Sequence, residues 1–416
     1  MEQEGKDDQI RYGKQSQLGS DMKRSPLLFV LLCLGLLSPR VQALTTNSAG
    51  FITYPSFSGG SYTMKPWLGR NVALLTPSSS SFQTNVMLKI LPALDKAYDF
   101  YESATAHKPA PWESTTFAGR DTIAVVDSTC GAGCSQIGAT GMEILGPYFQ
   151  ILYNGVAAQN QYDQVLFYEF GRNFWFYTSQ LAYQGADTDP VVTGLAVYMR
   201  FISMDAAGVA AGPFNGSTPF SSFRATVTNL MDSYVQASTL NWSNTFRQSI
   251  APPNSLGLGG SDLIASLLFR IARDFGGPKF PLDFWKQAEF RPPAHSTLEA
   301  TDNFVLAASA AVGGNLTGIF TTNWKWPVSV AALQEARARW GPPVIYHPRY
   351  LVQNPGNGNL RLSWQSQINS FYQPQESSDL RTWFNVSDPV SGNGSLLFLS
   401  ASNSFYPQRY FRLQIH

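Results

Sequence analysis

The sequence predicts an α+β main domain followed by a small all-β domain. Apolar runs typical of buried strands come first along the chain, and segments with apolar residues at helical spacing come after them. From about residue 344 the pattern changes to short alternating stretches separated by turn-forming residues. We therefore expect three parts: residues 1–43, a main domain of residues 44–343 and a β-sandwich of residues 344–416.

Apolar runs near the start of the main domain predict two buried strands, at residues 71–76 and 121–126. A third strand is expected within residues 141–153. In the tail, apolar residues at every second position predict strands over residues 360–364 and 411–415, because side chains alternate between the two faces of a strand.

Helices are expected where apolar residues recur every three or four positions. Pro92 should kink the first of them. Ser261 and Thr301 are the expected N-caps of the last two, because a hydroxyl there accepts a hydrogen bond from a free backbone N–H. Gly313 is expected to end the final helix. The expected helices cover residues 85–101, a stretch from about 163, and residues 190–201, 261–275 and 301–312.

Composition narrows the class of protein. The chain has 416 residues, of which 44% are apolar and 13% aromatic, enough for a large core. Charged residues make up 14%, and the formal net charge is +1. No basic stripe is present, so nucleic acid is not an expected partner. No stretch after the leader is long and apolar enough to predict a membrane-spanning helix.

The N-terminus has the features of a secretory signal. Lys23 and Arg24 precede the apolar run 27–37, and small residues follow it. The residues before Met22 are polar and charged, so we expect translation to start at Met22. A long charged leader and an uncleaved anchor are the alternatives. The mature protein is then expected to be secreted or held in the cell envelope.

Cysteine usage agrees with export. Cys33 lies in the signal, which leaves Cys130 and Cys134 in the sequence Cys-Gly-Ala-Gly-Cys. An isolated close pair in an oxidising compartment predicts a disulfide. The alternative is a metal site with two thiolates, but no further Cys or His lies nearby in the sequence.

The stretch LFYEFGRNFWFY, residues 166–177, has the layout of a zinc-peptidase motif. Such a motif places two histidines one helical turn apart, and a glutamate beside the first polarises the zinc-bound water. Here Tyr168 and Arg172 stand at the histidine positions, and Glu169 stands at the glutamate position. The main domain thus resembles zinc peptidases of the gluzincin type, which implies a zincin-like fold. In that family a third ligand lies on the next helix, and Thr193 stands there.

The resemblance implies a site that has lost its metal. Arginine stays protonated and neutral tyrosine is a poor zinc ligand, so we expect no zinc and no other cofactor. Arg172 would place a fixed positive charge near the former metal position, where it can pair with Glu169 on the same helix. Two alternatives stay open: an ordinary buried Glu–Arg pair in an unrelated α+β domain, and a hydrolase that uses Glu169 without zinc.

Other catalytic constellations have little support. No Gly-x-Ser-x-Gly elbow is present, and a pair of Glu169 and Asp205 that imitates a glycosidase site is common by chance in so long a chain. Most tryptophans are expected in the core. Residues 324–327 are expected to form a packed turn, with a ligand contact as the alternative. The histidines are never at one-turn spacing; they are His107, His295, His347 and His416.

The tail resembles a known module. Its series Leu-Ser-Trp364, residues 375–383, the turn 392–395 and residues 409–412 is similar to a C-terminal module common in secreted proteins of the Verrucomicrobia. That module is similar to fibronectin type III domains, so the resemblance implies a small β-sandwich and a bacterial host.

These observations predict a secreted or envelope protein with a metallopeptidase-like domain that lacks zinc ligands. We expect an inactive homologue of the peptidases that binds an extended peptide or a glycan over Glu169 and Arg172. The alternatives are the hydrolase named above and a structural adhesion or matrix component. The sequence does not set the oligomeric state.

Overall fold

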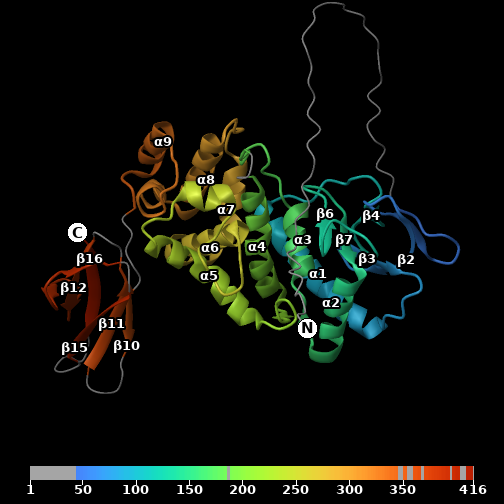
Figure 1. Cartoon of the computed structure of the whole chain (residues 1–416), viewed down its shortest axis with the longest axis horizontal. Helices are drawn as coiled ribbons and strands as arrows, with labels where there is room; N and C mark the ends of the chain where they lie inside the picture. Colours follow the sequence, from blue (N-terminus) through green and yellow to red (C-terminus); the bar gives the residue numbers. More distant parts are fainter. Residues whose placement is uncertain are drawn as a thin grey trace, which may run out of the picture. The chain divides into compact units, whose positions relative to one another are not determined.

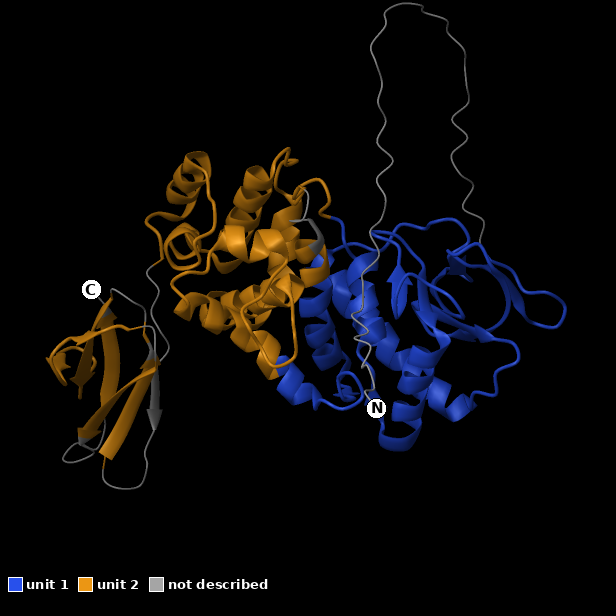
Figure 2. Ribbon diagram, in the orientation of Figure 1, with its two compact units in different colours: residues 1–176, 195–224 blue, residues 177–194, 225–416 orange. Residues whose placement is uncertain are grey.

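The structure, a computed structural model, describes seven segments of the chain (Figure 1). It forms two compact units, which Figure 2 shows in different colours. Unit 1 comprises Met1–Phe176 and Leu195–Arg224, and unit 2 comprises Tyr177–Gly194 and Ala225–His416. The expected leader, His347 and His416 lie outside the described segments. These segments are residues 44–184, 188–344, 350–353, 359–366, 370–393, 396–402 and 409–415.

A mixed sheet forms the centre of unit 1. Its strand order is β1-β2-β3-β5-β7-β6, and β4 also pairs with β5. Strands β3, β5 and β7 are parallel, whereas the outer strand β6 runs antiparallel to β7. The strands are β1 (Ile52–Pro55), β2 (Ser61–Leu68), β3 (Val72–Pro77), β4 (Thr116–Phe117), β5 (Arg120–Val126), β6 (Gly133–Ser135) and β7 (Met142–Leu145).

Both faces of this sheet are covered. On one face, Ala124 and Val126 of β5 join an apolar cluster with Tyr54 and Met64. Their neighbours along the strand point to the other face, where the helices pack. Burial on both faces explains why the strands read as unbroken apolar runs. The helices are α1 (Thr84–Thr105), α2 (Gly146–Gln159) and α3 (Val165–Asn173), and the short pair β8 (Gln161–Tyr162) and β9 (Ala210–Ala211) completes the unit.

The predicted strands 71–76 and 121–126 and the first predicted helix are confirmed as β3, β5 and α1, with Pro92 inside α1. The prediction of a strand over residues 141–153 is wrong after Leu145, because α2 begins there. Pro147 lies in the first turn of α2, a position that proline favours. The buried side of α2 then follows helical spacing, with Phe149, Leu152, Tyr153 and Val156.

Helices α4 (Thr188–Ala207) and α5 (Phe220–Gln236) contribute residues to both units. The longer helices of unit 2 are α6 (Gly260–Ile271), α7 (Phe280–Glu289), α8 (Thr297–Val312) and α9 (Val330–Trp340). Trp324 and Trp326 are 1% and 3% exposed, which confirms the packed turn. Short helical turns connect the longer helices: η2 (Trp242–Asn244), η3 (Phe246–Gln248), η4 (Ala272–Gly276), η5 (Gly277–Lys279) and η6 (Ile319–Asn323).

The predicted cap of α6 is wrong. The helix begins one residue before Ser261, and Gly259 is its N-cap. The N–H of Gly259 donates to Asp262 Oδ2 at 3.1 Å, so the acidic side chain of the first turn fixes the helix start.

The predicted cap of α8 is wrong as well. Ser296 is the N-cap, and its Oγ accepts the N–H of Glu299 at 3.2 Å. The helix therefore starts a full turn earlier than predicted, and Thr301 lies inside it, where its hydroxyl donates to the carbonyl of Thr297 at 2.8 Å. Gly313 ends α8 as predicted, with φ of 68°.

The tail contains two antiparallel sheets that share one apolar cluster. The predicted strands 360–364 and 411–415 are confirmed as parts of β11 and β16. One sheet contains β10 (Tyr350–Gln353), β11 (Asn359–Gln365) and β15 (Leu396–Ser402). The other contains β12 (Phe371–Ser377), β13 (Phe384–Asn385), β14 (Val390–Ser391) and β16 (Tyr410–Ile415). The shared cluster is Leu362, Trp364, Tyr372, Ala401 and Leu413.

Candidate functional site

Helix α3 carries the motif, and side chains fix both of its ends. At its start, the N–H of Val165 donates to Asp163 Oδ1 at 2.8 Å. At its end, Asn173 is 0% exposed. Its amide Nδ2 lies 2.7–3.1 Å from three carbonyl oxygens of the β6–β7 loop, those of Gln136, Ala139 and Gly141. The loop is therefore tied to the end of α3. Sequence reasoning missed Asn173.

Tyr168 and Arg172, which are predicted to stand at the two histidine positions, bind each other. Arg172 Nη2 donates to Tyr168 Oη at 3.0 Å across one helical turn. The guanidinium of Arg200, on α4, lies 5.8 Å from the centroid of the Tyr168 ring. Arg200 is 6% exposed and donates to Gln164 Oε1 at 2.6 Å. A phenol and a cation are thus hydrogen-bonded to each other here, beside a second cation.

Glu169 is 5% exposed and lies against the outer strand of the sheet. A Cβ at Gly133 of β6 would lie 2.8 Å from both Cγ and Oε1 of Glu169, so the strand approaches the carboxyl as closely as glycine permits. Burial raises the pKa of Glu169 to about 7, while the charge of Arg172 and the Ser135 hydroxyl lower the pKa in part. The charge of Arg172 thus favours the ionised form of Glu169, in the direction of the predicted attraction.

Thr193, which is predicted to stand at the third ligand position, is 3% exposed. It belongs to unit 2, whereas Tyr168, Glu169 and Arg172 belong to unit 1. The structure describes each unit by itself, so the convergence of Thr193 with the other three stays a prediction.

Cys130 and Cys134 form the predicted disulfide, with their Cα atoms 5.5 Å apart. Cys134 lies in β6, and Cys130 precedes the strand on the exposed surface. The bridge closes a five-residue ring that includes Gly133, the residue that covers Glu169.

The sheet contains two further buried acids that sequence reasoning missed. Asp121 Oδ1 accepts the N–H of Gly141 at 2.6 Å, and burial raises the pKa of Asp121 to about 7. Glu143 Oε1 accepts from Tyr54 Oη at 3.2 Å and from the N–H of Phe57 at 2.8 Å, and burial raises the pKa of Glu143 as well. The available signal was an acidic residue inside an apolar strand.

Among the residues that the structure describes, no group of three or more His, Cys, Asp or Glu side chains is arranged to hold a metal ion. His107 packs beside Phe176, with ring centroids 5.2 Å apart, and His295 is exposed. Within the same segments, no helix combines the length and the apolar character needed to cross a lipid bilayer.

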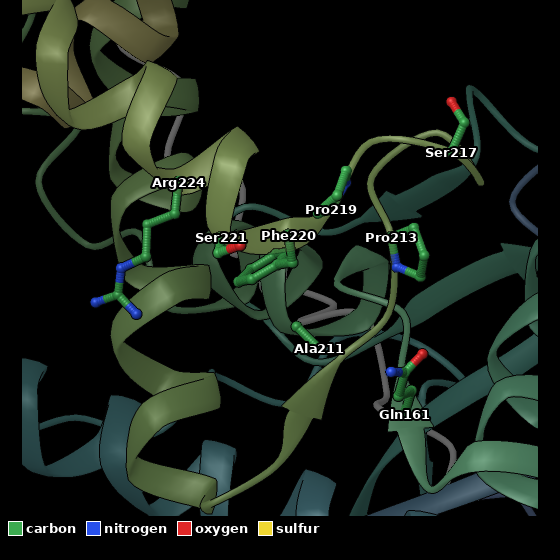
Figure 3. Close-up of a pocket in the computed structure, with 8 residues that line it drawn as sticks. All are labelled: Gln161, Ala211, Pro213, Ser217, Pro219, Phe220, Ser221 and Arg224. Carbon is green, nitrogen blue, oxygen red and sulfur yellow. The ribbon is translucent and has the colours of Figure 1, made fainter.

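A pocket of about 510 Å³ opens in unit 1 between the β8–β9 pair and the start of α5 (Figure 3). At one wall, Arg224 donates from both Nη atoms to the carboxylate of Asp205, at 2.8 and 2.7 Å. The adjoining loop is closed by a hydrogen bond from the N–H of Phe214 to the carbonyl of Thr218 at 2.7 Å. The lining combines apolar faces with neutral polar groups: Pro213, Pro219, Phe220, Gln161, Ser217 and Ser221.

No protein-family model and no curated protein matches the chain. Among solved structures, the chain is similar to Legionella pneumophila aminopeptidase A in complex with aspartic acid, at 14% identity and a TM-score of 0.36. It is also similar to the CBM32-1, CBM32-2 and M60 catalytic domains of Clostridium perfringens ZmpB, at 12% identity and a TM-score of 0.45. A third similar structure is the M60 catalytic domain of Clostridium perfringens ZmpC in complex with the sialyl T antigen, at 13% identity and a TM-score of 0.42.

The first of these matches covers 89% of this chain, the second 85% and the third 84%. The chain spans 37% of the length of each of the first two structures and 69% of the third. Identities and TM-scores this low carry no argument about activity. The class that the fold and the site define is therefore a disulfide-containing protein of mixed helix and sheet.

Proposed function

We propose that this chain is an exported binding protein, with a domain built like a zinc peptidase that does not hold zinc at the motif positions. The hydrogen bond from Arg172 to Tyr168 carries this proposal, because it fills both histidine positions with groups that satisfy each other. A guanidinium has no lone pair for a metal, and its charge repels a divalent cation. We therefore expect no zinc-dependent proteolysis from this site.

Zinc content tests this part of the proposal. Protein incubated with excess zinc and then desalted should retain no stoichiometric zinc by mass spectrometry. The triple variant Tyr168→His, Arg172→His, Thr193→Glu should gain one ion, and the double variant without Thr193→Glu should bind it more weakly. Stoichiometric zinc in the unaltered protein that disappears on Tyr168→Phe would contradict the proposal.

The outer strand β6 supports a peptide as the ligand. Its pairing with β7 is flanked by hydrogen bonds from Leu145 N to Ala132 O at 3.0 Å and from Gln136 N to Gly141 O at 3.1 Å. Residues 132, 134 and 136 therefore point their backbone groups toward β7, and the alternate residues point theirs to the outer edge. Among the described strands β6 is the last in the sheet, and the outward N–H and C=O of Ser135 are the groups that an added strand would bind, whereas Gly133 is buried.

A pair of variants at Ser135 isolates the edge. Ser135→Pro removes the outward N–H and leaves the bonds to β7 in place, since proline is tolerated on an edge strand. Ser135→Ala keeps that N–H and is the matched control. Fluorescence anisotropy with labelled tryptic peptides of β-casein should show binding to the wild type and the alanine variant, and binding at least roughly tenfold weaker to the proline variant. Equal affinities for all three proteins would exclude the β6 edge.

The pocket beside α5 supports the glycan form of the proposal. Sugars have apolar C–H faces and hydroxyl rims, and the lining offers proline and phenylalanine surfaces with neutral hydrogen-bonding groups. Arg224 is balanced there by Asp205, which favours a neutral glycan. Calorimetry with lactose and N,N′-diacetylchitobiose should show binding that Gln161→Ala weakens and the nearby surface change Gln159→Ala does not. Binding that both variants leave unchanged excludes this pocket.

One observation favours a hydrolase as a second candidate function. A buried carboxyl with a pKa near neutrality, as Glu169 has, is suited to transfer protons. This candidate predicts turnover of peptide or glycoside substrates that Glu169→Gln abolishes. Turnover that persists in that variant excludes Glu169 as the catalytic group, and absence of turnover supports the binding protein.

Export and the tail complete the proposal. The charged and apolar series before residue 44 supports secretion, and the two tail sheets with a shared core support a module that holds the protein at a surface or in an assembly. Fractionation of cells that express the chain should place it outside the cytoplasm, and replacing three leucines of the run 27–37 by arginine should retain it inside.

A further inference from the structure

We propose that the Cys130–Cys134 bridge is a redox-sensitive strap that holds β6 over the Glu169 carboxyl. Opening the bridge releases one end of the strand and admits water to the carboxyl. The inference concerns the motif region but does not depend on the proposed function, because it predicts a change of structure rather than of ligand binding.

The contact that the strap maintains is between Gly133 and Glu169. Gly133 lies inside the ring that the disulfide closes, and the space above its Cα is filled by Cγ and Oε1 of Glu169. Gly133 is buried, and φ at this residue is not positive, so the close contact rather than the backbone conformation requires a glycine. Moving β6 away from α3 would therefore uncover the carboxyl.

The two ends of β6 are held by different means. The strand has three residues and pairs with β7 over three register positions. At its far end, the amide of Asn173 binds the carbonyls of the following loop. At its near end, the disulfide ties Cys134 back to Cys130. So short a ladder is weak by itself, and we infer that the near end separates from β7 when the bridge is open.

The bridge is accessible to a reductant. Cys130 is exposed, and so are Asp127 and Ser128 before it, whereas Cys134 is half-buried. A thiolate of an external dithiol can therefore attack Cys130 Sγ, with Cys134 Sγ as the leaving thiolate. The second thiol of the reductant then resolves the mixed disulfide. The reductant loses two electrons and two protons as its own disulfide forms, and the chain gains both as two cysteine thiols.

The charged and polar groups around Glu169 stay in place when β6 moves, except for Ser135 on β6 itself. Arg172 is on α3, and Tyr101, whose pKa is raised in part by the charge of Glu169, is on α1. Arg200 on α4 acts on Tyr101 in the opposite direction. Opening the strap therefore removes mainly the effect of burial, and hydration lowers the pKa of Glu169 toward the ordinary value of 4.5.

The experiment compares the oxidised full chain with the chain reduced by dithiothreitol and with the double variant Cys130→Ser, Cys134→Ser. Carbon-13 NMR of protein labelled at the glutamate carboxyl follows the titration, and Glu169→Gln assigns the resonance. The pKa of Glu169 should fall from about 7 in the oxidised chain to below about 6 in the other two. Reoxidation should restore it.

Hydrogen exchange supplies an internal control, because the two ends of β6 should respond differently. The amide of Leu145, bonded to Ala132 beside the bridge, should exchange roughly tenfold faster or more after reduction. The amide of Gln136, beside the Asn173 contacts, should change little. Unchanged titration and exchange after full reduction would overturn the inference, and so would equal loosening of both ends. If the double variant does not fold, the reduced and reoxidised wild type decides the question alone.

Discussion

At the scale of single residues, unit 1 contains a set of buried carboxyl groups with raised pKa values. Asp121, Glu143 and Glu169 lie in or against the sheet, and burial raises the pKa of each. Each is held by a particular neighbour: Asp121 by a backbone N–H, Glu143 by a tyrosine hydroxyl and a backbone N–H, and Glu169 by contact with Gly133. Because the pKa values of Asp121 and Glu169 are raised to about 7, these two groups make the stability of the protein depend on pH near neutrality.

Replacing Glu169 should change that pH dependence. Because the folded state raises the pKa of Glu169 from 4.5 to about 7, it binds the proton more tightly than the unfolded state does. The free energy of unfolding is therefore expected to fall as pH rises from about 4.5 to about 7, by up to roughly 3 kcal/mol from this group. Glu169→Gln cannot ionise and should remove this part of the slope. Urea unfolding at pH 5 and pH 8 measures it. The exposed change Glu113→Gln is the control, and parallel slopes for wild type and Glu169→Gln would contradict the argument.

Asn173 is expected to contribute as much to the free energy of unfolding as any residue of the motif. Asn173→Ala leaves buried carbonyl groups of the β6–β7 loop without their donor, which we expect to lower the free energy of unfolding by roughly 2–4 kcal/mol. The exposed change Asn154→Ala on α2 should alter it by less than about 0.5 kcal/mol. Urea denaturation compares the two. Equal effects would show that the three contacts of Asn173 contribute little.

At the scale of elements, the structure differs from the predictions where helices begin. In α6 and α8 the observed N-cap precedes the predicted cap, by two positions in α6 and by five in α8. Each helix extends toward its N-terminus as far as residues are present that can hydrogen-bond to the free backbone groups of the first turn. A serine or threonine next to an apolar segment is then a helical residue and not its cap.

Two serine variants separate true cap from predicted cap. Ser296→Ala should destabilise the protein by about 1 kcal/mol, because the N–H of Glu299 loses its acceptor. Ser261→Ala should change the stability by less than about 0.5 kcal/mol, because Gly259 and Asp262 start that helix. Thermal unfolding of both variants gives the comparison. A larger loss for Ser261→Ala than for Ser296→Ala would reverse the assignment.

At the scale of the whole molecule, the described part of the tail has an apolar cluster of its own. The cluster of the tail contains residues between Leu362 and Leu413, whereas a cluster on one face of the large sheet contains residues between Leu44 and Val126. Separate cores are what allow parts of a chain to unfold separately. The boundary near residue 344 stays a prediction, because the tail belongs to the same compact unit as residues 225–344.

Removing the centre of the tail core tests that boundary. Trp364 is 1% exposed and packs beside Tyr372, so Trp364→Ala is expected to destabilise the tail by roughly 3–5 kcal/mol. Limited proteolysis should then cut within residues 359–415 and leave a fragment that ends near residue 340. Proteolysis of the tail and of that fragment at the same rate would show that the tail and the rest of the chain unfold together.

The sequence by itself determined the strands and helices with strong periodicity and the disulfide. These follow from local rules: alternation, helical spacing and the chemistry of close cysteines. Residues with strong local signals were therefore predictable, and α2 was not, because a short apolar run fits a strand and a helix equally well.

Only the tertiary structure decided what surrounds Glu169. The strand that covers it comes from a part of the chain more than thirty residues away in sequence, and the proximity of Gly133 depends on how β6 pairs with β7 and how Asn173 ties down the intervening loop. A pKa depends on the solvent and charges within a few ångströms, and contacts between distant segments set those. No local pattern in the motif contains that information.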